Sequence, residues 1–124
     1  MKKILTALLL IMTSSVTFAD MSDNDKSKTI ECTGIYYANS MIPQGELELE
    51  KIVHSFAAKK FLNSYLLKGG VKEEKLNEEL LKVVDIRYGK PYEEGTTKKC
   101  DEFIFKLISG SKDEIKKIAE SGIY

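Results

Sequence analysis

The sequence predicts an all-α protein, a compact bundle of about five helices tied by one disulfide. Apolar residues recur at the spacing of a helical face in successive segments after residue 28, and no convincing pair of alternating strand segments is found. Glycine and proline separate these segments, as expected at helix ends. The chain holds only two cysteines, Cys32 and Cys100, so a single intramolecular pairing is available.

The first residues have the three parts of an export signal. Lys2 and Lys3 make a basic start, residues 4–12 are almost entirely apolar, and small residues lead up to Ala19. The apolar run is too short to cross the roughly 30 Å hydrocarbon core of a bilayer. Residues 1–19 are therefore predicted to be a secretory signal peptide cleaved after Ala19. This predicts a periplasmic or secreted protein without a stable membrane anchor.

The expected mature chain is a single domain with a short leading segment. Residues 20–28 are polar and carry no apolar period, which predicts a flexible N-terminus. Residues 29–124 are long enough for one modest helical domain. Once the two lysines of the signal are removed, acidic residues outnumber basic residues by two. A mixed, nearly neutral surface gives no electrostatic indication of nucleic-acid binding.

The two cysteines are interpreted as a structural disulfide. Export places the chain in an oxidising compartment, where a pair of cysteines usually joins. Closing so long a loop would stabilise the fold by about 4 kcal/mol on the chain-entropy model. A redox or metal role is disfavoured because the chain lacks a Cys-x-x-Cys motif and has one histidine. We expect no metal site and no cofactor.

The first predicted helix covers residues 29–42. Ile35, Ala38 and Ile42 share one of its faces. Gly34 weakens the helix intrinsically, and we expect it to allow the close approach of a neighbouring helix. Pro43 ends the segment, because the residue before a proline disfavours helical geometry.

The next two predicted helices cover residues 46–68 and 71–88. The first is the longest and stops at Gly69 and Gly70, with glycine supplying a left-handed cap. The second has acidic residues early and basic residues late, as the helix dipole favours. Its inward face is predicted to consist of apolar residues at helical spacing: Leu76, Leu80, Val83, Val84 and Tyr88.

Two short helices are predicted to finish the chain. Residues 91–99 contain proline, glycine and two threonines and are expected to form a loop. Residues 100–108 then form a helix capped by Thr96 or Thr97. Ser111 and Glu114 match a capping box that opens the last helix.

The predicted loop at residues 91–99 supplies the candidate partner-binding residues Tyr92, Glu93 and Glu94. A tyrosine beside acidic residues suits a recognition surface, because tyrosine is enriched among the residues that dominate binding energy. The alternative is an ordinary solvated loop with no partner.

No catalytic residue is predicted. His54 is the only histidine, and no nucleophile motif accompanies it. The clustered glutamates could form a glycosidase-type carboxylate pair, but a sequence this rich in acidic residues produces such pairs by chance. We therefore expect a structural histidine, solvated helix faces and no enzymatic activity.

The stretch Thr97-Lys98-Lys99-Cys100-Asp101-Glu102-Phe103 places a late cysteine at the opening of a short helix, and a second short helix follows over residues 111–119. With the export signal and the two-cysteine frame, this resembles the periplasmic immunity proteins that protect bacteria from type VI secreted cell-wall amidases. More loosely, it resembles the HdeA-type acid chaperones. The first resemblance implies that a loop or helix end enters the active-site cleft of a toxin, for which residues 91–97 are the matching candidate.

The leading functional hypothesis is a small exported helical protein that acts by binding another protein, as an immunity protein or an inhibitor. One alternative is an acid-stress periplasmic chaperone, because many carboxylates would lose their charge at low pH. The other is a small cell-wall-acting hydrolase, which would require a cleft containing a carboxyl group of raised pKa.

Overall fold

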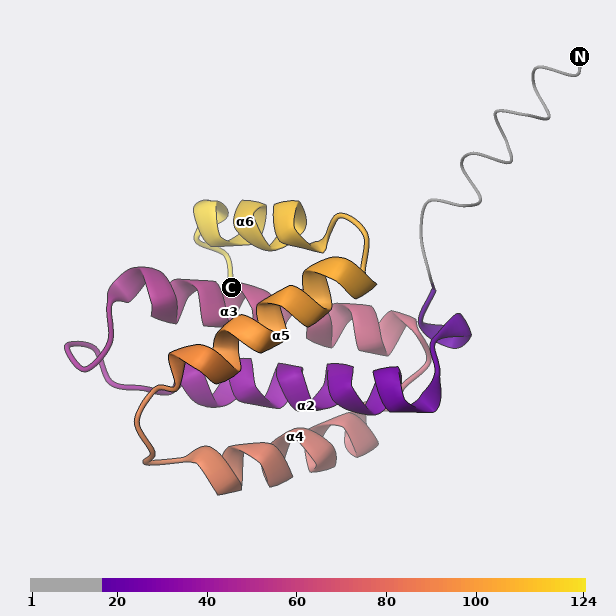
Figure 1. The fold of residues 1–124 in the computed structure, drawn as a ribbon, viewed down its shortest axis with the longest axis horizontal. Helices are drawn as coiled ribbons and strands as arrows, with labels where there is room; N and C mark the ends of the chain where they lie inside the picture. Colours follow the sequence, from indigo (N-terminus) through magenta and orange to yellow (C-terminus); the bar gives the residue numbers. More distant parts are fainter. Residues whose placement is uncertain (1–16) are drawn as a thin grey trace, which may run out of the picture.

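A computed structural model describes residues 17–124 (Figure 1), and within that range the chain forms five α-helices and no strand. Most of the expected signal peptide, residues 1–16, lies outside the described residues. A 3₁₀ turn, η1, precedes the helices. The elements are η1 (Phe18–Asp20), α2 (Asp23–Ser40), α3 (Leu49–Lys68), α4 (Glu73–Arg87), α5 (Glu94–Leu107) and α6 (Ser111–Ser121). The prediction of an all-α bundle of about five helices tied by one disulfide is confirmed.

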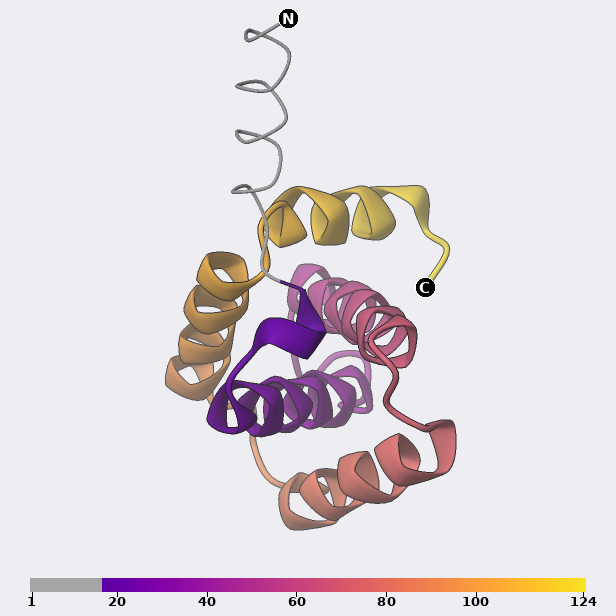
Figure 2. The ribbon, with the colours of Figure 1, turned by 90° about the vertical axis from the view of Figure 1, so that its right-hand side faces the viewer.

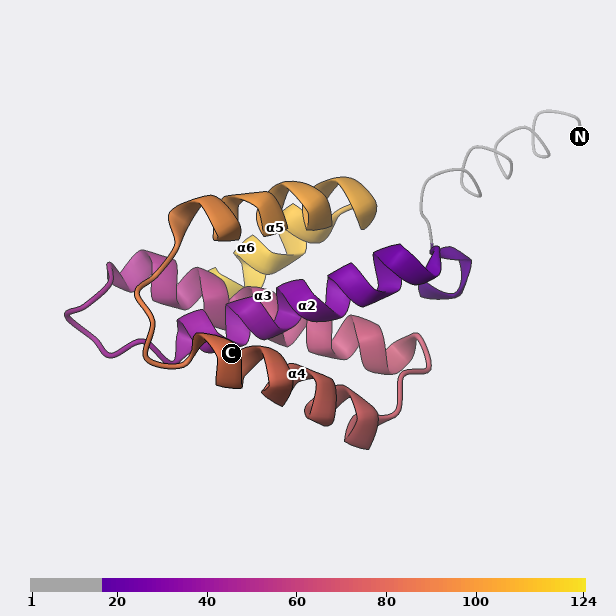
Figure 3. The same ribbon diagram turned by 60° about the horizontal axis from the view of Figure 1, so that its bottom comes forward.

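Helix α2 lies at the centre of the bundle. Its sides are covered by α3, α4 and α5, and α6 packs mainly on α3 (Figure 2). The chain passes back and forth, so the 41–48 and 88–93 connections come together at one end of the bundle (Figure 3). This end carries the residues predicted to bind a partner.

Helix α2 begins earlier than predicted. The hydroxyl of Ser22 caps it by accepting a hydrogen bond from the Asp25 backbone N–H at 3.1 Å. Asp23 and Asp25 occupy the first turn, where negative charge stabilises the helix dipole. Residues 23–28 of the segment predicted to be a flexible N-terminus are therefore the first turns of α2. The helix has no apolar period there because that part projects into solvent.

The expectation for Gly34 is confirmed. A Cβ atom at this position would lie 2.6 Å from the Cβ of Val83 in α4, which is closer than real Cβ contacts allow. Gly34 is buried at the contact between α2 and α4. The missing side chain therefore lets the two helices approach each other.

The core has two clusters of buried side chains. The larger cluster joins α2, α3, α5 and α6 around Tyr36, Leu62, Ile104 and Ile115, which are at most 1% exposed. The smaller cluster joins the end of α3 to α4. It consists of Leu66, Leu76 and Leu80. Both are built from the apolar faces predicted by helical spacing.

The end of α3 uses two glycines in different roles. Gly69 keeps helical geometry, and Gly70 adopts the left-handed conformation with φ +100°. The Val71 N–H then bonds to the Leu66 carbonyl, and the Gly70 N–H to the Leu67 carbonyl, which is the Schellman arrangement. The left-handed residue predicted from the glycine pair is therefore Gly70.

The last two helices also differ from their predicted starts. Helix α5 begins at Glu94, inside the predicted loop, and Thr97 is a buried helical residue rather than a cap. The capping box at Ser111 is absent. The Ser111 hydroxyl is buried and donates to the Ile104 carbonyl at 3.2 Å. Gly110, with φ +79°, occupies the cap position instead.

Phe18 packs onto the folded domain although it precedes the expected cleavage site. Its ring meets Tyr65 edge-on at a centroid distance of 6.2 Å, and a Cβ at Gly69 would lie 2.7 Å from the Phe18 Cβ. Cleavage after Ala19 would remove this ring and its contacts with both core clusters.

The Gly34 contact gives a stability prediction. Replacing Gly34 with Ala should lower the free energy of unfolding by about 1–3 kcal/mol, because the added methyl group forces α2 and α4 apart. Urea unfolding measures the change. The control is Gly95→Ala in α5, where the added Cβ meets no atom within 4 Å. It should leave the protein as stable or more stable, since alanine favours a helix. Equal losses in the free energy of unfolding for both variants would contradict the close approach of α2 and α4 at Gly34.

Candidate partner-binding site

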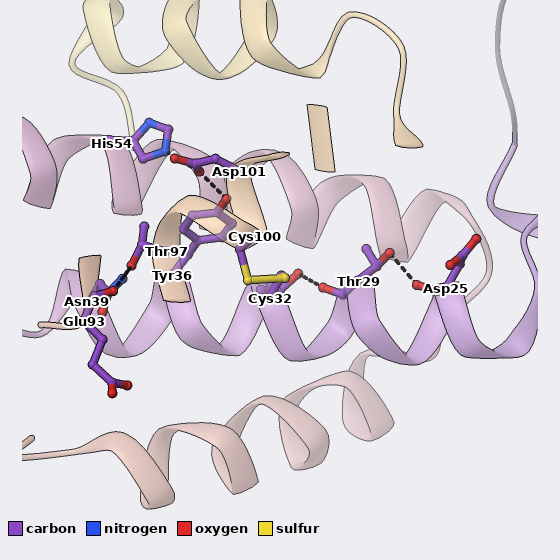
Figure 4. The surroundings of a disulfide bond; sticks show 11 residues. Asp25, Thr29, Cys32, Tyr36, Asn39, His54, Glu93, Thr97, Cys100 and Asp101 are labelled. Atoms are coloured by element: carbon purple, nitrogen blue, oxygen red, sulfur yellow. Dashed lines mark hydrogen bonds and ion pairs between the residues drawn. A yellow bond between two sulfur atoms is a disulfide. The ribbon is translucent and has the colours of Figure 1, made fainter. Parts of the chain in front are cut away.

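The candidate site depends on a seam between α2 and α5, which is shown in Figure 4. Its covalent link is the Cys32–Cys100 disulfide, which confirms the predicted pairing. The two Cα atoms are 5.5 Å apart, and the side chains are 1% and 4% exposed. The bond joins the middle of each helix, whereas the sequence placed Cys100 at the start of its helix.

A hydrogen-bonded carboxylate adds a second link to the seam. Asp101 Oδ1 in α5 accepts the hydroxyl of Tyr36 in α2 at 2.5 Å and lies 2.9 Å from His54 Nε2 in α3. Burial, together with the negative charge of Asp101, raises the pKa of Tyr36. His54 is half-buried beside the Tyr36 ring. One carboxylate thus connects three helices.

A third link fixes the start of α5. The amide of Asn39, near the end of α2, donates to Thr97 Oγ1 at 3.0 Å. The Thr97 hydroxyl in turn donates to the Glu93 carbonyl at 3.1 Å. Asn39 and Thr97 are nearly inaccessible, at 5% and 4% exposure. This chain of hydrogen bonds holds the 88–93 connection against the end of α2.

The three predicted partner-binding residues are tied to their surroundings. Glu93 Oε1 lies 2.7 Å from Arg87 Nη1, at the end of α4. Lys51 of α3 lies 3.6 Å from the Glu94 carboxylate and 5.4 Å from the centre of the Tyr92 ring. A hydrogen bond from Lys51 to Glu48 raises the pKa of the lysine. The predicted loop is therefore a short connection whose side chains contact two basic residues at the surface.

A cavity of about 640 Å³ lies between the 41–48 and 88–93 connections and the end of α2. We call it the interloop groove. Tyr92 contributes to its wall, while Glu93 and Glu94 lie outside its lining. The lining residues are Ala38, Asn39, Met41, Ile42, Pro43, Glu46, Leu47, Arg87, Tyr88, Gly89, Lys90, Pro91 and Tyr92.

Much of this wall was missed by reasoning from the sequence. Tyr88 was predicted to face inward, but it follows the last turn of α4 and is 70% exposed. Ile42 was assigned to the first helix, yet α2 ends at Ser40 and Ile42 belongs to the connection. Met41 is 44% exposed at the same edge. The sequence feature that could have indicated this wall is the presence of apolar residues next to the predicted helix breaks at Pro43 and Pro91.

The groove presents apolar and aromatic surface with one acidic and two basic side chains. Within residues 17–124, no group of three or more His, Cys, Asp or Glu side chains is arranged to hold a metal ion. His54 and Asp101 are not among the lining residues. Such a surface can bury an apolar side chain of a ligand and bond to its polar groups.

None of the helices in residues 17–124 is long and apolar enough to cross a membrane. No family model, no curated protein and no solved structure matches this chain.

The raised pKa of Tyr36 predicts a loss of stability at alkaline pH. The folded protein keeps this proton above pH 10, near which an unfolded tyrosine titrates, so the stabilisation is present below about pH 10 and is lost above it. The expected slope is about 1.4 kcal/mol per pH unit. Urea unfolding between about pH 9 and 11 should give a steeper slope for the wild type than for Tyr36→Phe, which keeps the contribution of Tyr65, whose pKa is also raised by burial.

The matched control for this measurement is Tyr88→Phe, which removes an exposed hydroxyl. It should retain the alkaline slope of the wild type. An identical slope in wild type and Tyr36→Phe would contradict the assignment.

The hydrogen bonds that join Asn39, Thr97 and Glu93 predict that removing the Thr97 hydroxyl destabilises the protein. Thr97→Val should lower the free energy of unfolding by about 1–3 kcal/mol, because it leaves the buried Asn39 amide without its acceptor. The neighbouring Thr96→Val serves as the control and should cost less than about 0.5 kcal/mol. Chemical denaturation of both variants measures the difference. Equal unfolding midpoints would contradict a stabilising role for the hydrogen bonds of Thr97.

Proposed function

We propose that this protein is a non-enzymatic, exported binding protein that recognises a partner protein through the interloop groove. The observation that carries the proposal is a partly apolar, partly aromatic cavity whose edge exposes Tyr88 and Met41. Large apolar side chains exposed together around a cavity are typical of protein-interaction sites. Tyrosine, methionine and arginine are also enriched in interfaces.

The seam between α2 and α5 supports this proposal because it makes the groove rigid. The disulfide and the buried hydrogen bonds of Asn39 and Thr97 hold the 88–93 wall against α2 before a partner arrives. A preformed site avoids the entropic cost of ordering loops on binding. Rigid presentation suits an inhibitor or immunity protein that blocks a partner sterically.

The acidic residues at this end favour a partner with basic groups near its apolar anchor. Glu46 lines the groove, and Glu93 and Glu94 flank it with side chains that are 59% and 77% exposed. Their ion pairs with Arg87 and Lys51 are at the surface, where such pairs contribute little stability. The carboxylates can therefore exchange those bonds for bonds to a partner.

A capture experiment with matched variants tests the proposal. Tagged mature protein with the disulfide intact is incubated with a periplasmic extract, and the bound protein is identified and titrated. Met41→Ser combined with Tyr88→Ser should weaken binding about tenfold or more without lowering the melting temperature, since both side chains are exposed. Glu93→Gln combined with Glu94→Gln should weaken binding less and make it less sensitive to salt.

The control variant is Leu81→Ser. Leu81 is 51% exposed on α4 and does not line the groove, so the affinity should remain that of the wild type. Equal affinity of the Met41 and Tyr88 double variant and the wild type would remove the groove from the proposal. Hydrolysis of wall material by the pure protein would instead support the enzymatic alternative.

A further inference from the structure

A second surface lies on the outer side of α3, away from the interloop groove. Its residues recur at helical spacing and line a hollow of about 460 Å³ together with the last residue of the chain. We call this surface the lysine face. Its lining residues are Phe56, Lys59, Lys60, Asn63, Ser64, Leu67, Lys68 and Tyr124.

The charge of the lysine face is one-sided. Three of its residues are lysines and none has an acidic side chain, although acidic and basic residues are equal in number over the whole sequence. Lys59 lies over the Tyr37 ring at 4.1 Å, and Lys60 and Lys68 are exposed. Phe56 and Leu67 add apolar surface between these charges. The face is therefore complementary to a ligand that combines acidic groups with an apolar ring.

The end of the chain already occupies part of this face. Figure 2 shows the segment after α6 turning back toward α3. Tyr124 places its ring 5.5 Å from the Phe56 ring, and the Ile123 carbonyl accepts a hydrogen bond from Lys60 Nζ at 2.8 Å. Within its own fold, the protein therefore already places an aromatic ring against Phe56 and a backbone carbonyl against Lys60.

The contacts of this tail are few and exposed. Ile123 and Tyr124 are 69% and 46% exposed, so little apolar surface is removed from water. The turn is held by Ser121, whose hydroxyl donates to the Ile118 carbonyl at 2.7 Å and accepts from the Ile123 N–H at 3.1 Å. A ligand could make the same ring and carbonyl contacts and also place acidic groups near the lysines. Such a ligand would bind more tightly than the tail and displace it.

We propose that the lysine face binds an acidic, aromatic-containing segment of a partner protein and that Tyr124 occupies the position of its aromatic residue until that segment displaces it. This surface is separate from the interloop groove, so the inference stands independently of the proposed function. The two surfaces also differ in charge, because the groove is lined by one acidic and two basic side chains and the lysine face by basic side chains without an acidic one.

The test uses the full mature protein and a synthetic peptide, acetyl-Glu-Asp-Glu-Tyr-Asp-Glu-amide, in calorimetric titrations at low and at physiological salt. The wild type should bind it, more tightly at low salt. Tyr124→Ala should bind roughly twofold to tenfold more tightly, because it removes a competing ring contact. Lys60→Glu combined with Lys68→Glu should weaken binding about tenfold or more, since two attractive charges become repulsive.

Matched controls distinguish binding at the lysine face from nonspecific attraction by the net charge of the protein. Lys98→Glu combined with Lys99→Glu makes the same change in net charge at exposed positions outside the face and should bind like the wild type at physiological salt. A peptide with alanine in place of tyrosine should bind more weakly to the wild type and equally to the wild type and Tyr124→Ala. Circular dichroism verifies that every variant is folded.

Three results would overturn the proposal. Weaker or unchanged binding by Tyr124→Ala would show that the tail does not compete for the site. Binding to phosphatidylglycerol vesicles without binding to the peptide would assign the lysines to a lipid surface. Self-association that Lys60→Glu and Lys68→Glu abolish, again without peptide binding, would make the occupant a second copy of the chain.

Discussion

The disulfide between Cys32 and Cys100 is the constraint on which the arrangement of this small protein depends. It spans 68 residues and joins the central helix α2 to α5. The noncovalent links from Tyr36 to Asp101 and from Asn39 to Thr97 lie along the same two helix faces, because all these residues recur at helical spacing. Together they fix the direction of α5 and therefore the position of the 88–93 connection. The interloop groove follows from that position.

In the proposed function, stability depends on the seam and recognition on the side chains around the groove. Closing a loop of 68 residues constrains the unfolded chain by about 4 kcal/mol, a large share of the 5–15 kcal/mol typical of a domain. By contrast, the pairs Arg87–Glu93 and Lys51–Glu94 lie at the surface and contribute about 0–1 kcal/mol each. Exposed residues at the edge of the groove, such as Met41 and Tyr88, can change at little cost in stability, whereas changes in the buried seam cost more. This division suits the proposed binding function.

The sequence predicts the helices and two of the contacts between distant residues. The disulfide followed from having only two cysteines, and the close approach at Gly34 followed from a glycine placed within a predicted helix. The start of α2 at Asp23 was missed because its first turns face solvent and show no apolar period. The bond between His54 and Asp101 joins residues 47 positions apart, and no local pattern indicates it. Tyr92 lines the groove, but its role in partner binding stays a prediction. Its apolar neighbours come from the far end of α2.

The central claim is that the disulfide fixes α5, and native-state hydrogen exchange tests it most directly. Exchange of backbone amides is compared between the oxidised protein and a Cys32→Ala, Cys100→Ala double variant. The account predicts that protection falls most in α5, while α2, α3 and α4 keep much of theirs through the contacts of α2 with α3 and α4. An equal loss of protection in all helices, or unchanged protection in α5, would contradict the claim that the disulfide specifically positions this helix and the groove beside it.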